Sequence, residues 1–154
     1  MSVLSGENAP NFNHPTGDGG ECKLSDFKHK PLVLYFYPKD DTPGCTTEAQ
    51  GFRDAMAEFA KFGTTIVGVS KDTVKKHDRF KARHYLNFTL ISDEDGTLCE
   101  AYGVWVEKNL YGRKYMGIER STYLIDGEGK IAKVWRKVRV KGHVDNVLEA
   151  VQAL

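Results

Sequence analysis

The sequence predicts an α/β protein with a central mixed sheet flanked by helices. Two apolar runs, Leu32–Tyr37 and Thr64–Ser70, have the length and the β-branched and aromatic content of buried strands. Residues 46–62 lie between them with apolar side chains at helical spacing, so the three segments form a βαβ unit with parallel strands. Two later strands, 119–126 and 130–138, are joined by a short glycine-rich turn and must be antiparallel. Both kinds of pairing in one chain indicate a mixed sheet.

The N-terminal segment predicts a β-hairpin that precedes this core. Pro10–His14 and Glu21–Leu24 flank a run of proline, glycine and aspartate at 15–20, which is typical of a turn. Cys22 lies in the second arm, where a small buried thiol is the favoured interpretation. The hairpin is therefore an extension added to the N-terminal side of the sheet.

A second helix follows the second strand. Asp72 or Thr73 can cap its N-terminus, and the helix is expected to run to about Tyr85. The spacing of its apolar residues predicts that Val74, Phe80 and Tyr85 face inward.

The remaining segments complete the order of elements. Phe88–Ser92 is a short strand, and a short helix containing Cys99 comes next. Leu110–Ile118 is loop or ribbon, and His143–Leu154 is an amphipathic helix. This order is that of a thioredoxin-like fold with an N-terminal hairpin extension, in a single domain over residues 1–154.

Composition argues against two classes of partner. A formal net charge of +1 on 154 residues gives no basis for binding nucleic acid or an anionic membrane. The first residues lack the basic and apolar parts of a signal peptide, and no apolar run approaches the ~18 residues of a spanning helix. Cys22, Cys45 and Cys99 are too few and too scattered for a disulfide framework. We therefore expect a cytoplasmic protein with no nucleic-acid or membrane partner.

The junction between the first strand and its helix carries the candidate nucleophile. Pro38–Cys45 contains two prolines and a glycine, so the chain turns there and then enters the helix. Cys45 is expected at, or one residue before, the first turn of that helix. The free N–H groups and the positive dipole end of a helix N-terminus favour an anion, here a thiolate. The pattern thus predicts a reactive cysteine.

The neighbours of Cys45 exclude several other cysteine chemistries. A thioredoxin-type redox pair needs a cysteine three positions on, where the chain has Glu48. A cysteine-dependent phosphatase needs an arginine six positions on, where the chain has Gly51. Zinc requires clustered thiol and imidazole ligands, and the thiols are scattered. The histidines share no spacing, so we expect neither a metal nor a cofactor; they are His14, His29, His77, His84 and His143.

Several separated motifs resemble those of the peroxiredoxins. Pro38, Thr42 and Cys45 match the Pro-x-x-x-Thr/Ser-x-x-Cys signature of that family. The resemblance implies reduction of hydrogen peroxide and organic hydroperoxides to water or alcohols, with a thiol as electron donor, in antioxidant defence and redox homeostasis. Further segments are similar to the bacterioferritin-comigratory branch, also called PrxQ, and they span the whole chain: 35–38, 42–46, 91–93, 102–105 and 120–126.

The resemblance also implies a role for each site residue. Cys45 is the peroxidatic nucleophile, Thr42 hydrogen-bonds the peroxide, Arg120 stabilises the thiolate and the transition state, and Pro38 shields the thiolate from water. From its residues alone, however, Arg120 also fits a solvated strand arginine, and Thr42 before Pro43 also fits simple turn chemistry.

The chain departs from its family where a second cysteine is expected. Many relatives carry a resolving cysteine five residues after the nucleophile, where this chain has Gln50. Others carry it in the next helix, and 73–85 contains none. Cys99 remains possible but is not favoured. We therefore predict a 1-Cys variant whose sulfenic acid is resolved by an external thiol.

Two other functions remain open at this point. The first is a non-enzymatic peroxide sensor or redox relay, and the second is a thiol–disulfide oxidoreductase that leaves peroxide alone. For the peroxidase, the resemblance implies thioredoxin or glutaredoxin/glutathione as reductant and a monomer, with a weak dimer as the alternative.

Overall fold

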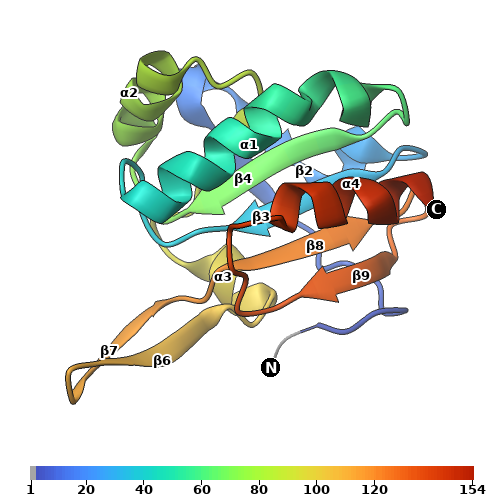
Figure 1. Cartoon of the computed structure of the whole chain (residues 1–154). Helices are drawn as coiled ribbons and strands as arrows, with labels where there is room; N and C mark the ends of the chain where they lie inside the picture. The colour runs from blue at the N-terminus through green and yellow to red at the C-terminus, as the bar shows by residue number, and fades with distance from the viewer. Residues whose placement is uncertain (1–2) are drawn as a thin grey trace.

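Five strands form one mixed sheet in the order β5-β4-β3-β8-β9, as the computed structural model of residues 3–154 shows (Figure 1). β3 pairs in parallel with β4, β4 pairs in parallel with β5, and β8 is antiparallel to both β3 and β9. The mixed sheet, the βαβ unit and the C-terminal hairpin are therefore confirmed. The strands are β3 (Leu32–Phe36), β4 (Thr65–Ser70), β5 (Thr89–Ser92), β8 (Ser121–Ile125) and β9 (Ile131–Trp135).

Four helices cover the two faces of this sheet. They are α1 (Pro43–Ala60), α2 (Val74–His84), α3 (Thr97–Ala101) and α4 (His143–Gln152). α1 and α4 lie side by side across one face (Figure 1), where they pack on Val33, Tyr35 and Leu124. α3 lies on the opposite face with Leu34 and Phe36. The alternation along β3 thus supplies both cores, because successive side chains of a strand point to opposite faces.

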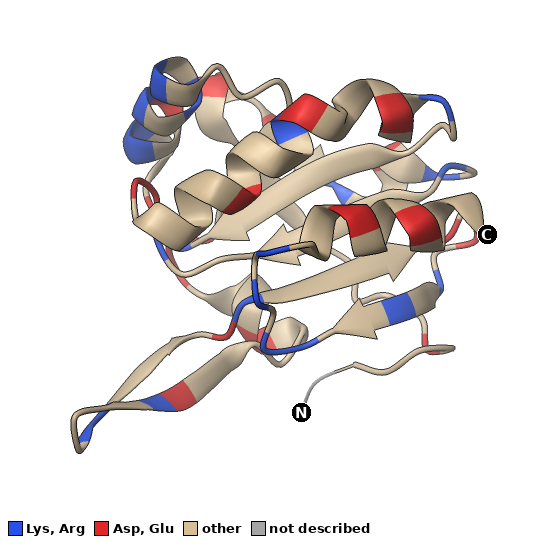
Figure 2. Ribbon diagram, in the orientation of Figure 1, with Lys and Arg blue, Asp and Glu red and all other residues tan. Residues whose placement is uncertain are grey.

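Charged side chains avoid the centre of the sheet. β3, β4, β5 and β8 contain no lysine, arginine, aspartate or glutamate, and Figure 2 shows the coloured positions mainly on helices, loops and the ribbon that projects from the sheet. Lys133 in β9 is the exception, and β9 is an edge strand. A lysine on an edge strand discourages pairing with another chain.

The structure corrects two predicted helix details. α1 begins at Pro43 rather than at Thr46, because proline is well suited to the first helical position and Thr42 serves as the N-cap. Tyr85 was expected to face inward, yet it is 82% exposed and ends α2 in a left-handed conformation. His77 takes the inward position beside Phe80.

Outside the sheet, the chain forms two hairpins. β1 (Asn13–Pro15) and β2 (Glu21–Lys23) pair as the predicted N-terminal hairpin. β6 (Trp105–Leu110) and β7 (Arg113–Ile118) form an antiparallel ribbon that projects from the body (Figure 1). The prediction of loop or ribbon for 110–118 is therefore confirmed as a ribbon. The first strand of that ribbon, β6, was not predicted. No helix within residues 3–154 is long and apolar enough to span a membrane.

Candidate active site

Cys45 is the third residue of α1 and lies within the first turn of the helix. Its side chain faces the sheet, and only 1% of the residue is exposed. The first N–H groups of the helix have no acceptor one turn earlier. They therefore favour a negative charge at this end of the helix, where the Cys45 sulfur lies. The expected placement of Cys45 at the start of the helix is confirmed, since it lies in the first turn.

Arg120 bridges the sulfur and a buried carboxylate. Its Nη2 donates to Sγ of Cys45 at 3.3 Å, and its Nη1 donates to Oε1 of Glu48 at 2.7 Å. Arg120 lies in the link between β7 and β8, so the cation comes from a segment far along the chain from the helix that carries the thiol. The planar guanidinium can reach both partners at once, which a lysine ammonium cannot do in the same geometry.

Glu48 is the site residue that the sequence analysis missed. It is fully buried, three residues after Cys45 and hence on the same face of α1. Burial raises the pKa of its carboxyl to about 7, and the Arg120 guanidinium only partly offsets that effect. Its Oε2 has no hydrogen-bond partner. The sequence did contain a signal, because Glu48 is an acidic residue on the apolar face of the predicted helix. The sequence analysis used Glu48 only to exclude a second cysteine at that position.

The charges around the guanidinium favour its protonated form. Burial opposes the charge of Arg120, but the Glu48 carboxylate and the Cys45 sulfur outweigh it and raise the pKa of Arg120. The same cation acts on His143, whose pKa falls to about 4 through burial first and Arg120 second. The Nε2 of His143 lies 2.8 Å from the Thr122 hydroxyl, so a neutral imidazole fills this wall of the site.

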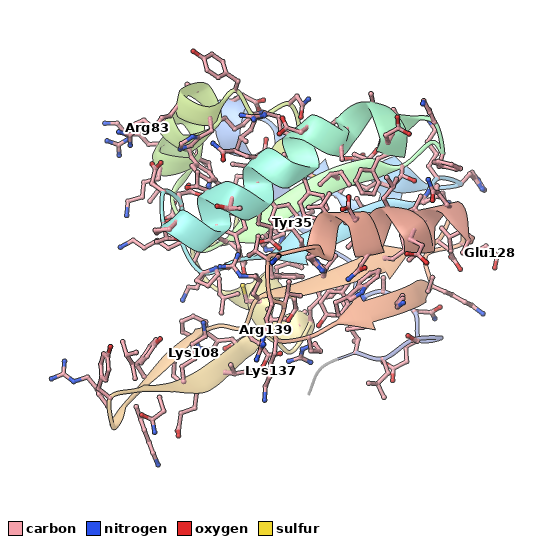
Figure 3. The ribbon with its side chains drawn as sticks, viewed as in Figure 1. Tyr35, Arg83, Lys108, Glu128, Lys137 and Arg139 are labelled. Atoms are coloured by element: carbon pink, nitrogen blue, oxygen red, sulfur yellow. The ribbon has the colours of Figure 1, made fainter. Side chains whose placement is uncertain are left out.

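A second cation and a tyrosine lie near the same group. Burial and the field of Arg120 lower the pKa of Lys108, while the Cys45 sulfur acts in the opposite direction. Figure 3 shows Lys108 on the projecting ribbon and Tyr35 on the sheet beneath α1 and α4. The Tyr35 hydroxyl is buried without a partner. Burial, followed by the fields of Glu48 and Cys45, raises the pKa of Tyr35. The region around the sulfur is therefore dry, with positive charge on one side.

Thr42 and Pro38 lie in the loop that leads into α1. The Thr42 hydroxyl donates to the carbonyl oxygen of Lys39 at 2.8 Å, which leaves its oxygen free to accept. Pro38 is half-buried and follows Tyr37, the buried residue that comes after β3. Within residues 3–154, no hydrogen bond joins Pro38 or Thr42 to the Cys45 sulfur. The structure thus brings Arg120 to the sulfur directly and supplies Thr42 and Pro38 as neighbours in the chain.

The other two cysteines lie across the sheet from Cys45. Cys45 belongs to the core under α1 and α4, whereas Cys22 and Cys99 belong to the core on the opposite face. All three thiols are free. Burial raises the pKa of Cys22 to about 12 and holds that of Cys99 well above its ordinary range. A disulfide to Cys45 would have to cross a closed sheet, because its Cα atoms must come within ~7 Å.

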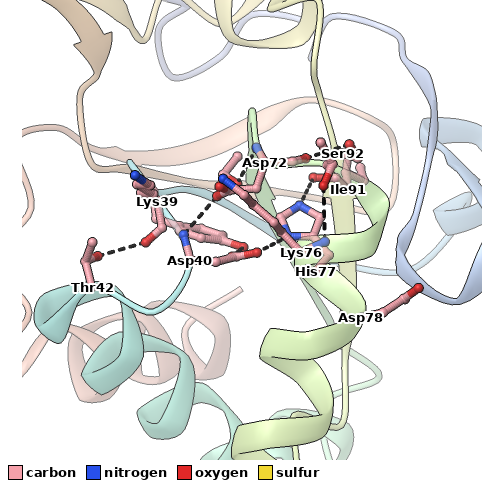
Figure 4. A network of polar contacts seen from close by, with 12 residues as sticks. Lys39, Asp40, Thr42, Asp72, Lys76, His77, Asp78, Ile91 and Ser92 are labelled. Atoms are coloured by element: carbon pink, nitrogen blue, oxygen red, sulfur yellow. Dashed lines mark hydrogen bonds and ion pairs between the residues drawn. The ribbon is translucent and has the colours of Figure 1, made fainter.

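A buried polar network fixes the loop before α1 (Figure 4). Asp40 accepts from the Tyr37 hydroxyl at 2.6 Å and lies 2.6 Å from Nδ1 of His77. The Nε2 of His77 faces the carbonyl oxygen of Ile91 at 2.8 Å, so that nitrogen carries a hydrogen. The backbone N–H of Asp40 donates to Asp72 at 2.8 Å. α2 is therefore tied to the active-site loop through fully buried groups.

The fold brings together two side-chain groups that the sequence spacing did not suggest as metal ligands. His14, Asp93 and Asp95 form one group, and Asp40, Asp72 and His77 form the other, each with ligand atoms within 4.8 Å. In the second group the side-chain atoms are already used by the network of Figure 4. We assign a metal to neither group.

A buried thiol held against an arginine at a helix N-terminus, in a thioredoxin-like sheet, defines a cysteine-based oxidoreductase. Residues 5–134 match the family model described as AhpC/TSA family. The chain is 55% identical to a putative peroxiredoxin Bcp of Coxiella burnetii, covering 96% of this chain and 98% of that protein. It is 50% identical to peroxiredoxin Bcp of Bacillus subtilis, covering 99% and 97%.

A solved structure extends the similarity to three dimensions. It is that of the bacterioferritin comigratory protein of Xanthomonas campestris, studied for alkyl peroxide reduction as trapped intermediate and ligand complexes. The TM-score is 0.91 at 44% identity, covering 97% of this chain and 98% of that one. The chain therefore belongs to the AhpC/TSA family, and within it to the Bcp/PrxQ peroxiredoxins. It is a thiol-dependent peroxidase.

The buried carboxyl predicts a pH dependence of stability. Because the pKa of Glu48 is raised from 4.5 to about 7, the folded state keeps a proton that the unfolded state has lost between these values. The free energy of unfolding should therefore fall as pH rises through this window. Glu48→Gln removes that loss, so its stability relative to wild type should grow by about 3 kcal/mol between pH 4.5 and 8. Urea unfolding at several pH values measures it.

Glu58→Gln is the matched control, since Glu58 is an exposed residue of the same helix. Its stability relative to wild type should not change with pH. A flat difference for Glu48→Gln as well would mean that Glu48 titrates like an exposed carboxylate.

Gly44 allows the guanidinium to approach the helix start. A Cβ there would lie 3.2 Å from Nη2 of Arg120. Since that group is held by both Cys45 and Glu48, Gly44→Ala should displace it and slow oxidation of the thiol by peroxide roughly 10-fold. Gly51→Ala is the control, because its Cβ would lie 3.0 Å from Val144 of α4, away from the site. Stopped-flow oxidation should show the loss only in Gly44→Ala, and equal rates would refute this account of Gly44.

Proposed function

We propose that the Cys45 thiolate attacks one oxygen of a hydroperoxide, hydrogen peroxide or an organic hydroperoxide. An S–O bond forms as the O–O bond breaks, the sulfur is oxidised to sulfenic acid, and the departing hydroxide or alkoxide takes a proton to become water or an alcohol. The observation that carries the proposal is the 3.3 Å contact between Nη2 of Arg120 and the Cys45 sulfur. The reduction of alkyl peroxides by the Xanthomonas relative supports the organic substrates.

The roles of the neighbouring residues follow from how charge moves in this step. Negative charge leaves the sulfur and appears on the departing oxygen, so a cation that spans both positions favours the transition state. Arg120 is placed to do this, and Glu48 acts as a positioning residue that orients its fork. The Thr42 oxygen, whose hydrogen is donated to Lys39, can accept the hydrogen of the peroxide. Pro38 limits access of water to the sulfur.

The sulfenic acid is then reduced by a thiol from outside the chain. Gln50 offers no thiol, and Cys22 and Cys99 lie beyond the sheet with strongly raised pKa values. Thioredoxin or glutaredoxin/glutathione would serve as the reductant. We further propose a single domain over residues 1–154 that works as a monomer or weak dimer. The three free cysteines support a reducing, cytoplasmic location.

Turnover distinguishes this enzyme from the two rival functions. A peroxide sensor or relay would be oxidised once per molecule and would cycle slowly with excess thiol. A thiol–disulfide oxidoreductase would act on mixed disulfides without peroxide. Multiple turnovers of peroxide with excess thiol support the peroxidase, and a single turnover would favour the relay.

One cysteine should suffice for activity. Cys45→Ser should abolish peroxide reduction, because serine is not nucleophilic at neutral pH. The double variant Cys22→Ser/Cys99→Ser should keep it with an external thiol. Mass spectrometry after peroxide alone should find sulfenic or over-oxidised Cys45. A stoichiometric Cys45–Cys99 disulfide, together with lost turnover in Cys99→Ser, would overturn the external-thiol route.

Replacing the bridging arginine should separate charge from geometry. Arg120→Lys keeps the positive charge but cannot contact Cys45 and Glu48 together. We expect peroxide reduction to slow by about 10- to 100-fold, a loss of ~1.4–2.7 kcal/mol in transition-state stabilisation. Arg136→Lys is the control, since Arg136 pairs with Glu119 outside the site. An unchanged rate in Arg120→Lys would show that the double contact of Arg120 with Cys45 and Glu48 is not needed for peroxide reduction.

A further inference from the structure

A polar cavity of about 450 Å³ adjoins the loop that leads into α1. It lies between that loop and α2 and is separate from the pocket of Cys45, which does not line it. A volume of this size suits a small-molecule ligand. Its walls are charged throughout and consist of Lys39, Asp40, Asp41, Asp72, Lys76, Arg79 and Arg83.

The carboxylates of the cavity already have hydrogen-bond or ion-pair partners within the protein. Asp40 is engaged by Tyr37 and His77, as described above. Asp72 accepts from the Ser70 hydroxyl at 2.6 Å and from a backbone N–H. Asp41 lies 3.0 Å from Nε2 of His84 and 3.6 Å from Arg83. The acidic wall therefore offers little to a cation from solution.

Three of the four cations that line the cavity, in contrast, lack carboxylate partners. Across residues 3–154, Lys39, Lys76 and Arg79 have no carboxylate within 4.0 Å. All three are exposed, and Figure 4 shows Lys39 and Lys76 beside the buried network. In Figure 2 the Lys and Arg positions on α2 outnumber its acidic ones. Unpaired cations around a cavity attract an anion, and carboxylate is an anion that lysine and arginine bind well.

The cavity is close to the reacting sulfur along the chain. Asp41 lines it and precedes Cys45 by four residues, so their Cα atoms are at most ~14 Å apart. Lys39, which also lines it, holds the Thr42 hydroxyl through its carbonyl oxygen. A ligand of tripeptide size is roughly 10 Å long when extended, before its side chain is counted. Such a ligand can place its acidic end in the cavity and its middle at the edge of the active-site loop.

We propose that this cavity binds the carboxylates of the reducing thiol, a small molecule that carries one thiol and two carboxylates. The proposal rests on the proposed function, in which a thiol from solution must reduce the Cys45 sulfenic acid. That thiol attacks the sulfenic sulfur, an S–S bond forms and hydroxide leaves as water. A second thiol attacks the mixed disulfide, which yields the free disulfide and restores the Cys45 thiol.

The test compares glutathione, which has two carboxylates, with 2-mercaptoethanol, which has none. Lys76→Gln/Arg79→Gln should raise the KM for glutathione about 10-fold and leave the KM for 2-mercaptoethanol unchanged. Lys75→Gln/Arg113→Gln removes the same charge from exposed positions outside the cavity and should change neither value. Added salt should weaken the wild-type preference for glutathione, since exposed charges are screened.

Two further outcomes distinguish a failure of this proposal from a failure of the proposed function. Oxidation of Cys45 by peroxide without thiol tests the proposed function alone, and it should proceed at the same rate in both double variants. If it proceeds but the glutathione KM of Lys76→Gln/Arg79→Gln is unchanged, the cavity does not bind the reductant. If that variant loses turnover only with thioredoxin, the surface binds an acidic protein and the small-molecule assignment is wrong.

Discussion

The guanidinium of Arg120 is the group on which the rest of the site depends. It is half-buried between a thiol and a carboxylate, and removal of the carboxylate would leave its charge without a counter-ion inside the protein. Burying such a group is favourable only where hydrogen bonds take the place of water, so helix and hairpin must meet at a fixed separation. The packing of α1 on the sheet sets that separation. Gly44 allows the approach, because any larger residue would meet the guanidinium.

The same requirement explains the polar groups beyond the site. The loop before α1 must hold its conformation, since it positions both the N-cap Thr42 and the first turn of the helix. The buried hydrogen bonds among Tyr37, Asp40 and His77 keep the loop in that conformation. A buried network with all members paired is rigid, whereas one unpaired member would cost more than the network contributes. α2 thus serves the site without contacting the sulfur.

Periodicity and turn chemistry were sufficient to predict most of the fold. Leu32–Tyr37 and Thr64–Ser70 are runs of apolar residues whose length leaves one interpretation, and the glycine-rich turn near Gly127 specifies a hairpin. The ribbon strand from Trp105 was missed because its residues are half-exposed or exposed and mixed in character, so they lack the sequence pattern of a buried strand. Tyr85 was misplaced because an apolar residue at a helix end can leave the helix in a left-handed cap.

The site could be predicted only in part, for a different physical reason. Cys45 is visible from local sequence, since a helix start is a local property. The pairing of Arg120 with Glu48 joins residues 72 positions apart, and no local pattern encodes it. The charges that make the cavity beside α2 were visible as residues, but their lack of partners was not.

The sheet that separates Cys45 from Cys22 and Cys99 has a consequence for the lifetime of the enzyme. On the proposed external-thiol route, the sulfenic acid waits for a thiol to arrive by diffusion, because Cys22 and Cys99 lie across the sheet. During that wait a second peroxide molecule can oxidise the same sulfur. The product is a sulfinic acid, which ordinary thiols do not reduce. The fraction of molecules lost per cycle is then set by the ratio of peroxide to thiol in the surroundings. Such an enzyme is inactivated irreversibly once the supply of reducing thiol runs short.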